Sequence, residues 1–224
     1  MPPKALTAEE IIQRCVRTYG SVRSFTGRAL VSSSVTMPGQ PKAQMRAEAR
    51  IAFVRPGKLR VDGVTSLGGR DNTYLVVSDG KRSWLKASFL PKVEETTDVS
   101  MHIAAVTGVG LQAPTTLPAL LIGQSWGYPF MGTPRLLGRE RVQGVECYKI
   151  RIESPVTQTT VWIDTGQFLL RRMHQKHDMK ALRSRMPAPQ GAGPDTIPDQ
   201  MELTHEFVEQ KVNQPVPGTL FRKP

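Results

Sequence analysis

Residues 53–63, with the sequence FVRPGKLRVDG, show the pattern on which the whole chain is built. Apolar residues alternate with other residues on both sides of Pro56-Gly57, a pair that is typical of a tight turn. Leu59 and Val61 continue the apolar positions after the turn. The stretch therefore predicts a strand, a reversal and a second strand of an antiparallel meander with one apolar face. The other positions around the turn are basic: Arg55, Lys58 and Arg60.

The same period of two recurs along most of the chain. Residues 45–53 alternate apolar and mostly charged side chains, and Asp79-Gly80 separates two strand-like runs as a strong hairpin signal. Residues 134–154, 159–179 and 199–212 carry further runs of this kind, bounded by turn residues. We count about nine to eleven strands, nearly all joined by hairpins. An antiparallel sheet of this width must curl.

An amphipathic helix is predicted before the strands, over residues 8–19. Thr7 and Glu10 match a capping box, and Gly20 is a typical stop signal. Apolar residues recur between them at helical spacing, so the helix has one face to bury. These residues are Ile11, Ile12, Cys15, Val16 and Tyr19.

Two segments interrupt the alternation. Residues 99–125 contain two short helix-like pieces rich in Met and Leu and separated by Gly and Pro, which predicts a helical insertion or lid. Residues 180–199 are rich in Pro, Gly and Ala and predict a long mobile loop. Strand-type sequence continues after this loop, so we expect a single domain over residues 1–224.

The predicted fold is mainly β (α+β). It is a strongly curved, unclosed antiparallel β-sheet, or half-barrel, with an N-terminal helix and short helices that plug its concave face. On sequence alone, the apolar helices either fill the core permanently or move aside to open a container for an acyl chain or apolar peptide.

The charge balance and the motifs exclude several classes of function. Lys and Arg number 30 against 19 Asp and Glu, a net charge of +11, which favours anionic partners. Basic residues are nevertheless spread over almost every segment, which indicates a solvated basic outer face, and no nucleic acid is expected as a partner. No phosphate loop, GxSxG, HExxH or GxGxxG motif is present, so we predict neither an enzyme nor a cofactor.

Histidines and cysteines give no metal site by their spacing. His174 and His177 are three residues apart on a predicted strand, so their side chains point to opposite faces. Cys15 and Cys147 form no CxxC motif and are either two buried thiols or one long-loop disulfide. No run approaches the ~20 apolar residues of a membrane-spanning helix, and the opening MPPKALTAEE lacks a signal-peptide pattern.

The layout resembles the bacterial lipoprotein-carrier superfamily (LolA/LolB-like), in particular its outer-membrane lipoprotein-sorting-like branch. The resemblance covers most of the chain in the expected order. It lies in the N-terminal helix followed by YGSVRSFTGRALV, FVRPGKLRVDG, VSDGKRSWLKASFLPK, GRERVQGVECYKIRI, VWIDTGQFLLRRM and VNQPVPGTLFRKP.

The resemblance implies an apolar cavity that binds lipid-modified or other apolar ligands outside the cytoplasm. Carriers of this family hold the helical lid shut with an Arg on an early strand, for which Arg28, Arg46 and Arg50 are candidates. The expected cavity residues lie on the curved strands and in the lid. They are Ile51, Phe53, Leu59, Val61, Trp84, Met101, Ile103, Leu117, Leu120, Leu121, Ile150 and Trp162.

These observations and the resemblance give three hypotheses for the function. The first is a non-enzymatic periplasmic carrier or binding protein for lipoprotein acyl chains or related lipids, with donor and acceptor proteins in the envelope and an anionic membrane surface as partners. The second is an envelope-stress sensor that binds apolar ligands or protein segments. The third, a polyanion or nucleic-acid binder, rests on net charge alone and predicts binding that weakens steeply with salt.

Overall fold

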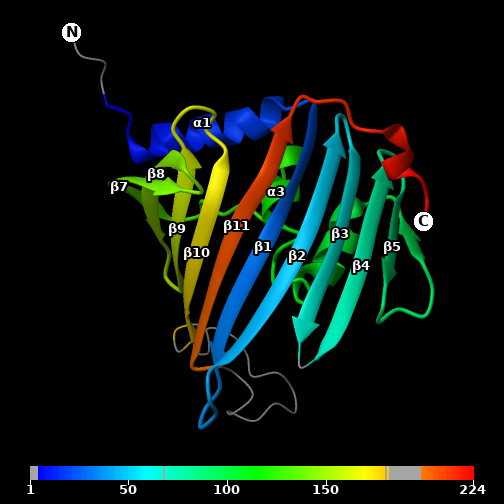
Figure 1. Ribbon diagram of the computed structural model, residues 1–224, viewed down its shortest axis with the longest axis horizontal. Helices are drawn as coiled ribbons and strands as arrows, with labels where there is room; N and C mark the ends of the chain where they lie inside the picture. The colour runs from blue at the N-terminus through cyan, green and yellow to red at the C-terminus, as the bar shows by residue number, and fades with distance from the viewer. Residues whose placement is uncertain (1–4, 68, 180, 182–197) are drawn as a thin grey trace. The chain divides into compact units, whose positions relative to one another are not determined.

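The computed structural model describes residues 5–67, 69–179, 181 and 198–224. Most of the segment 180–199, predicted as a mobile loop, lies outside the described residues. The strands form one eleven-stranded antiparallel sheet in the order β6-β5-β4-β3-β2-β1-β11-β10-β9-β8-β7, which does not close because β6 and β7 are its two edges (Figure 1). The predicted fold class, an unclosed antiparallel sheet with helices, is confirmed.

The chain begins with a helix and six strands, in the order expected from the hairpin signals. Their bounds are α1 (Ala8–Ser21), β1 (Ser24–Thr36), β2 (Ala43–Val54), β3 (Lys58–Leu67), β4 (Arg70–Asp79), β5 (Ser83–Ala87) and β6 (Glu94–Thr96).

The helical insertion follows, and five strands and a short 3-10 helix complete the chain. Their bounds are α2 (Val99–Thr107), α3 (Thr116–Ile122), β7 (Thr133–Val142), β8 (Val145–Glu153), β9 (Thr157–Asp164), β10 (Leu170–Asp178), β11 (Gln200–Val212) and η2 (Gly218–Phe221).

The chain divides into two compact units. Unit 1 comprises residues 1–16, 32–44 and 129–204, and unit 2 comprises residues 17–31, 45–128 and 205–224. The single domain over residues 1–224 stays a prediction.

In unit 1, the capping box at the start of α1 forms as predicted. The backbone N–H of Thr7 donates to Glu10 Oε2 at 2.8 Å, and the N–H of Glu10 donates to Thr7 Oγ1 at 3.2 Å. These bonds satisfy donors that the first helical turn cannot pair internally. One turn further on, the guanidinium of Arg14 lies 5.3 Å from the ring centre of Phe168, which stacks on Tyr148.

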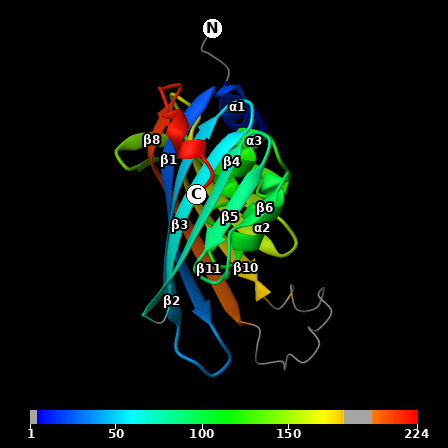
Figure 2. The same ribbon diagram turned by 90° about the vertical axis from the view of Figure 1, so that its right-hand side faces the viewer.

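In unit 2, the strands β2 to β5 have one face covered by helices. Register pairs Phe53 with Leu59, Ile51 with Val61, and Val76 with Leu85. All six side chains are buried, and because successive residues of a strand alternate between faces, they share one face of the sheet. We call this the inner face; α2 packs on it over β4 and β5 (Figure 2).

Two tight turns of unit 2 match the sequence signals. The Arg55-Pro56 peptide is cis, and the reversal at Pro56-Gly57 joins β2 to β3. Gly80 has φ of +96° in the β4–β5 hairpin, a conformation that L side chains rarely adopt. The Asp79 side chain supports this hairpin by accepting from the backbone N–H groups of Lys81 and Arg82, each at 2.8 Å.

Cys15 and Cys147 are free, buried thiols in unit 1. Burial raises the pKa of Cys147 to about 11, assisted by the nearby Asp164 carboxylate, and burial also raises the pKa of Cys15. Because the thiolate is the reactive species, both side chains are poorly reactive in the folded protein.

We therefore predict that Ellman's reagent at pH 8 labels neither cysteine of the native protein within minutes. The same reagent in guanidinium chloride, as the control, labels both. Rapid labelling of the native protein would contradict the burial, and absence of labelling after unfolding would show that the two cysteines are joined in a disulfide.

Candidate functional site

The inner face of unit 2 provides an apolar floor. Leu59, Val61 and Val76 have no exposed surface, and Ile51 is 2% exposed. Such a surface on one side of a sheet is stable only when another element removes it from water. The residues predicted for the cavity on β2 and β3, namely Ile51, Phe53, Leu59 and Val61, all lie on this face.

Helices α2 and α3, with the loop 108–115 between them, provide the cover, which we call the roof (residues 99–122). Ile103, Leu117 and Leu121 are completely buried, and Leu120 is 3% exposed. Asp98 caps α2 by accepting from the N–H of Ser100 at 2.8 Å. These four apolar residues are buried within the roof, and their place in the lining of a cavity stays a prediction. Met101 is not buried: its side chain is 63% exposed, so its expected place in the lining is wrong.

One buried polar pair joins the roof to the floor. Ser83 Oγ on β5 and His102 Nδ1 on α2 are 2.9 Å apart, and the two residues are 0% and 4% exposed. Burial lowers the pKa of His102, opposed by the neighbouring carboxylates of Glu94 and Asp98. A serine hydroxyl hydrogen-bonded to a histidine can also act as a nucleophile with the imidazole as its base. The Ser83 hydroxyl, however, has no exposed surface through which a substrate could reach it.

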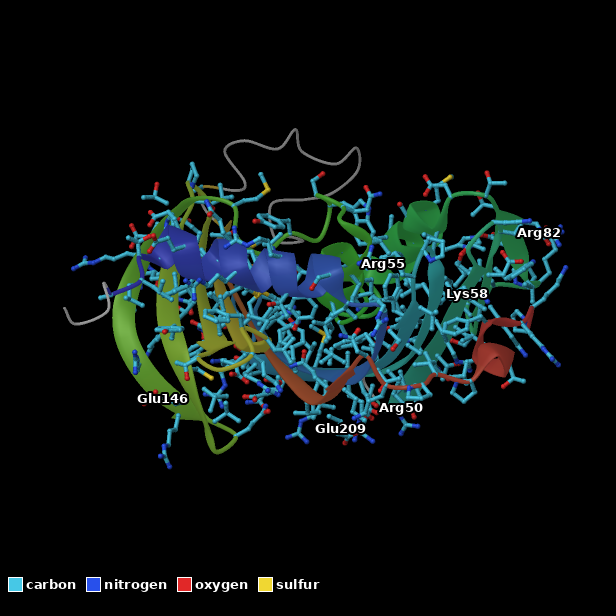
Figure 3. The ribbon with its side chains drawn as sticks, turned by 90° about the horizontal axis from the view of Figure 1, so that it is seen from above. Arg50, Arg55, Lys58, Arg82, Glu146 and Glu209 are labelled. Atoms are coloured by element: carbon cyan, nitrogen blue, oxygen red, sulfur yellow. The ribbon has the colours of Figure 1, made fainter. Side chains whose placement is uncertain are left out.

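Arg55 holds the end of the roof. Its Nε donates to the carbonyl of Val22 at 2.9 Å, and its Nη2 donates to the carbonyls of Tyr19 at 3.3 Å and Leu121 at 3.0 Å. The guanidinium also lies 5.3 Å from the ring centre of Phe53. Arg55 thus connects the turn after β2, the end of α1 and the end of α3, and Figure 3 shows it on the helix side of the strands.

The three arginines expected to hold the roof lie elsewhere. Arg28 forms ion pairs with Glu48 at 3.1 Å and Glu209 at 2.6 Å, and Arg50 pairs with the same Glu48 at 3.1 Å. These side chains belong to the outer face of the sheet, opposite the helices, as Figure 3 shows for Arg50 and Glu209. Arg46 is exposed. The residue that contacts the roof is Arg55.

Trp84, predicted for the lining, faces away from it. Trp84 pairs in register with Val77 and donates through Nε1 to Glu95 Oε2 at 2.6 Å, with the guanidinium of Arg82 at 5.5 Å from its ring. Its neighbours Ser83 and Leu85 occupy the inner face. The inward placement of Trp84 is therefore wrong; this strand has three consecutive buried residues, so exposure pattern alone does not reveal its parity.

Ile150 and Trp162 belong to unit 1. Ile150 pairs with Val161, so Trp162 lies on the opposite face of the same strands. There the indole packs with Val142 and Cys147, between Lys149 Nζ at 5.4 Å and the Arg172 guanidinium at 5.5 Å. Ile150 and Trp162 cannot line one surface together, which corrects their joint assignment.

The two histidines of β10 bind separate threonines. His174 Nδ1 lies 3.0 Å from Thr204 Oγ1, and His177 Nδ1 lies 3.0 Å from Thr157 Oγ1. Within the described part of the chain, no three His, Cys, Asp or Glu side chains are grouped so that they could hold a metal ion. In the same residues, no helix combines the length and hydropathy that crossing a bilayer requires.

A groove of about 660 Å³ lies on the outer face of unit 2. Its lining carries four basic and two acidic side chains, and the ion pairs of Arg28 with Glu209 and of Arg60 with Asp62 lie within it. Arg28 and Arg50 also pair with Glu48, so the three arginines of the lining are each ion-paired, and this pairing weakens their attraction for a polyanion. The charged lining residues are Arg28, Arg50, Arg60, Asp62, Glu209 and Lys211.

Comparison with solved structures finds similar chains at low identity and low TM-score. A DUF1329 family protein from Desulfovibrio piger has 12% identity and a TM-score of 0.40, with 97% of this chain and 98% of that chain covered. A LolA superfamily protein from Nitrosomonas europaea has 11% identity and a TM-score of 0.36, with 98% and 99% covered. The structural neighbours are LolA-superfamily and related proteins.

A third neighbour is a domain of an outer membrane lipoprotein-sorting protein from Vibrio parahaemolyticus, with 10% identity, a TM-score of 0.38, and 96% and 98% of the two chains covered. No family model and no curated protein matches the chain.

Replacing Arg55 by Ala should loosen the roof. Hydrogen bonds from a charged donor contribute about 1.5–3 kcal/mol each, and the carbonyls of Tyr19, Val22 and Leu121 would lose their common donor. We expect a loss of about 2–4 kcal/mol in the free energy of unfolding, measured by chemical denaturation, and faster amide hydrogen exchange in α2 and α3.

Arg50→Ala is the matched control, because its side chain is 71% exposed and pairs only at the surface. It should change stability by less than about 0.5 kcal/mol and leave exchange in the roof unaltered. Equal effects of the two substitutions would show that Arg55 does not hold the roof.

His102 should make the protein less stable in mild acid. Its folded-state pKa lies below the unfolded value, so as pH falls below about 6.5 the unfolded chain binds a proton before the folded chain does, and stability falls until the folded pKa is passed. His102→Asn keeps a polar group near Ser83 and should reduce the stability difference between pH 7.5 and pH 5. His177, whose pKa burial also lowers, contributes in the same direction in both proteins. An unchanged pH dependence in His102→Asn would refute the prediction.

Proposed function

We propose that this protein is a non-enzymatic carrier or binding protein for the acyl chains of lipoproteins or related lipids. The ligand enters between the inner face of unit 2 and the roof, and takes the place of roof side chains on the floor. The placement outside the cytoplasm, in the periplasm, follows from the family resemblance of the sequence.

The construction of the roof is the observation that carries this proposal. Helices α2 and α3 are only nine and seven residues long, and helices this short are unstable in isolation. Their apolar side chains fill the space over the floor, and the polar links described at Ser83 and Arg55 tie them to the strands. Such a cover can be displaced without breaking a strand pair of the sheet.

The energetics favour a long acyl chain over a small apolar ligand. Exposing Ile103, Leu117 and Leu121 would cost about 1.5–3 kcal/mol each, or roughly 5–9 kcal/mol in all. A buried methylene contributes about 0.8 kcal/mol, so about a dozen methylenes are needed before binding exceeds this cost. Ligands of that length are typical of lipid and lipoprotein acyl groups.

Displacement of a fluorescent fatty-acyl probe tests the proposal. We expect micromolar binding that is nearly independent of salt, together with a co-purifying lipid in native mass spectrometry. Leu121→Glu should abolish binding by placing a charge in the apolar interior of the roof, whereas Leu137→Glu, at a surface position that is 39% exposed, should not. Circular dichroism checks that both variants are folded.

Arg55→Ala gives a second test that does not depend on the folding of a core variant. Loosening the roof should speed probe uptake, because opening precedes entry of the ligand. A folded protein that binds neither probe nor lipid would overturn the proposal. Probe binding without transfer to acceptor vesicles would favour the sensor, and steep loss of binding with salt would favour a polyanion ligand.

A further inference from the structure

Tyr74 on β4 has a buried hydroxyl with no hydrogen-bond partner among the described residues. The side chain is 2% exposed and lies on the inner face, where β4 pairs Tyr74 with Gly63 of β3. A Cβ at Gly63 would overlap the Tyr74 ring, so glycine at this position lets the ring lie flat on the floor. An unpaired buried hydroxyl is costly, which calls for a function or a partner outside the chain.

Thr65 supplies a second unpaired hydroxyl beside it. Its Oγ1 is buried and without a partner among the described residues, and the side chain is 3% exposed. Thr65 follows Gly63 by two residues on the same face, which makes it a diagonal neighbour of Tyr74 at about 7–8 Å between backbones. Val61 and Val76 adjoin them on this face, and the other buried hydroxyls of the face, those of Ser78 and Ser83, lie further along β4 and β5, so Tyr74 and Thr65 form a separate polar group beside apolar floor.

The loop of the roof between α2 and α3 covers the Tyr74 hydroxyl. A Cβ at Gly110, in the loop between α2 and α3, would lie 2.7 Å from this oxygen, so the loop backbone is directly against it. The next two residues, Leu111 and Gln112, have φ of +49° and +62°. Non-glycine residues in this left-handed region are each strained, and lifting the loop would release that strain.

The charge around Tyr74 selects the kind of group that it can bind. Burial and the nearby Asp62 carboxylate raise the pKa of Tyr74, so its hydroxyl stays protonated and can donate. The Arg55 guanidinium on this side of the sheet donates to three backbone carbonyls. A free carboxylate beside Tyr74 would be buried near the negative charge of Asp62, which is costly. A neutral carbonyl carries no net charge and avoids this cost.

We propose that the Tyr74 hydroxyl, assisted by Thr65 Oγ1, donates a hydrogen bond to the carbonyl oxygen of an ester or amide that carries the acyl chain. The 108–115 loop lifts, the carbonyl takes the place of Gly110 against the hydroxyl, and the hydrocarbon runs along the inner face over Val61 and Val76. This assignment rests on the proposed function and names its ligand class: neutral acyl esters and amides in preference to free fatty acids.

The test compares three fluorescent probes of equal chain length: an acyl methyl ester, the matching alkyl ether without a carbonyl, and the free acid. Wild-type protein should bind the ester roughly five- to tenfold more tightly than the ether, the contribution expected of one hydrogen bond, and more tightly than the acid. Tyr74→Phe should remove the preference of ester over ether without weakening ether binding, and Thr65→Val should reduce it.

Tyr148→Phe, on β8 in unit 1, is the matched control and should leave all three affinities unchanged. In the absence of ligand, Tyr74→Phe should leave the thermal midpoint unchanged or raised, because the hydroxyl it removes has no partner. A lowered midpoint would show that a buried water already satisfies this hydroxyl and would overturn the inference.

The two proposals fail in different ways. Equal binding of ester and ether by wild-type protein, or tighter binding of the free acid, overturns the assignment of Tyr74 and leaves the acyl-binding function intact. Absence of binding for all three probes by the folded protein overturns the function, and the assignment with it.

Discussion

The fold of unit 2 depends on keeping the apolar inner face of β2 to β5 out of water. Among the described residues the strands form a single antiparallel sheet, and this face is covered by two short helices between β6 and β7. Burial by short helices satisfies the hydrophobic requirement but gives little independent stability to the cover. The strands of the floor are therefore more stable than the roof. This difference in stability makes a binding function physically reasonable, because the roof can open while the sheet stays folded.

Much of the fold could be predicted because local signals agreed with one another. Alternation around Pro56-Gly57, the Asp79-Gly80 hairpin and the Thr7–Glu10 capping box are each short-range patterns, and each forms in the structure. The inward residues of β2 and β3 followed from the same alternation. These features need no knowledge of distant parts of the chain.

Predictions failed where the face of a strand had to be known. Arg55 continues the alternate positions of Ile51 and Phe53, which face inward, whereas Arg46 and Arg50 occupy the other set of positions. The alternation therefore already indicated that Arg55, and neither Arg46 nor Arg50, lies on the side of the helices. Trp84 is different, since Ser83, Trp84 and Leu85 are all buried and only the contact of Ser83 with His102 decides which face is inner. The unpaired hydroxyls of Tyr74 and Thr65 are likewise invisible in sequence, because a missing partner is a property of packing.

The position of Arg55 also links two helices that have no cationic residue in their own last turns. Carbonyl groups at the C-terminal end of a helix carry partial negative charge and usually have a nearby Lys, Arg or His. Neither α1 nor α3 has one, and the same guanidinium serves both ends. Because one side chain is a shared C-terminal cap, withdrawal of α3 leaves Arg55 bound to the end of α1, so the cation stays in place to receive α3 again when it returns.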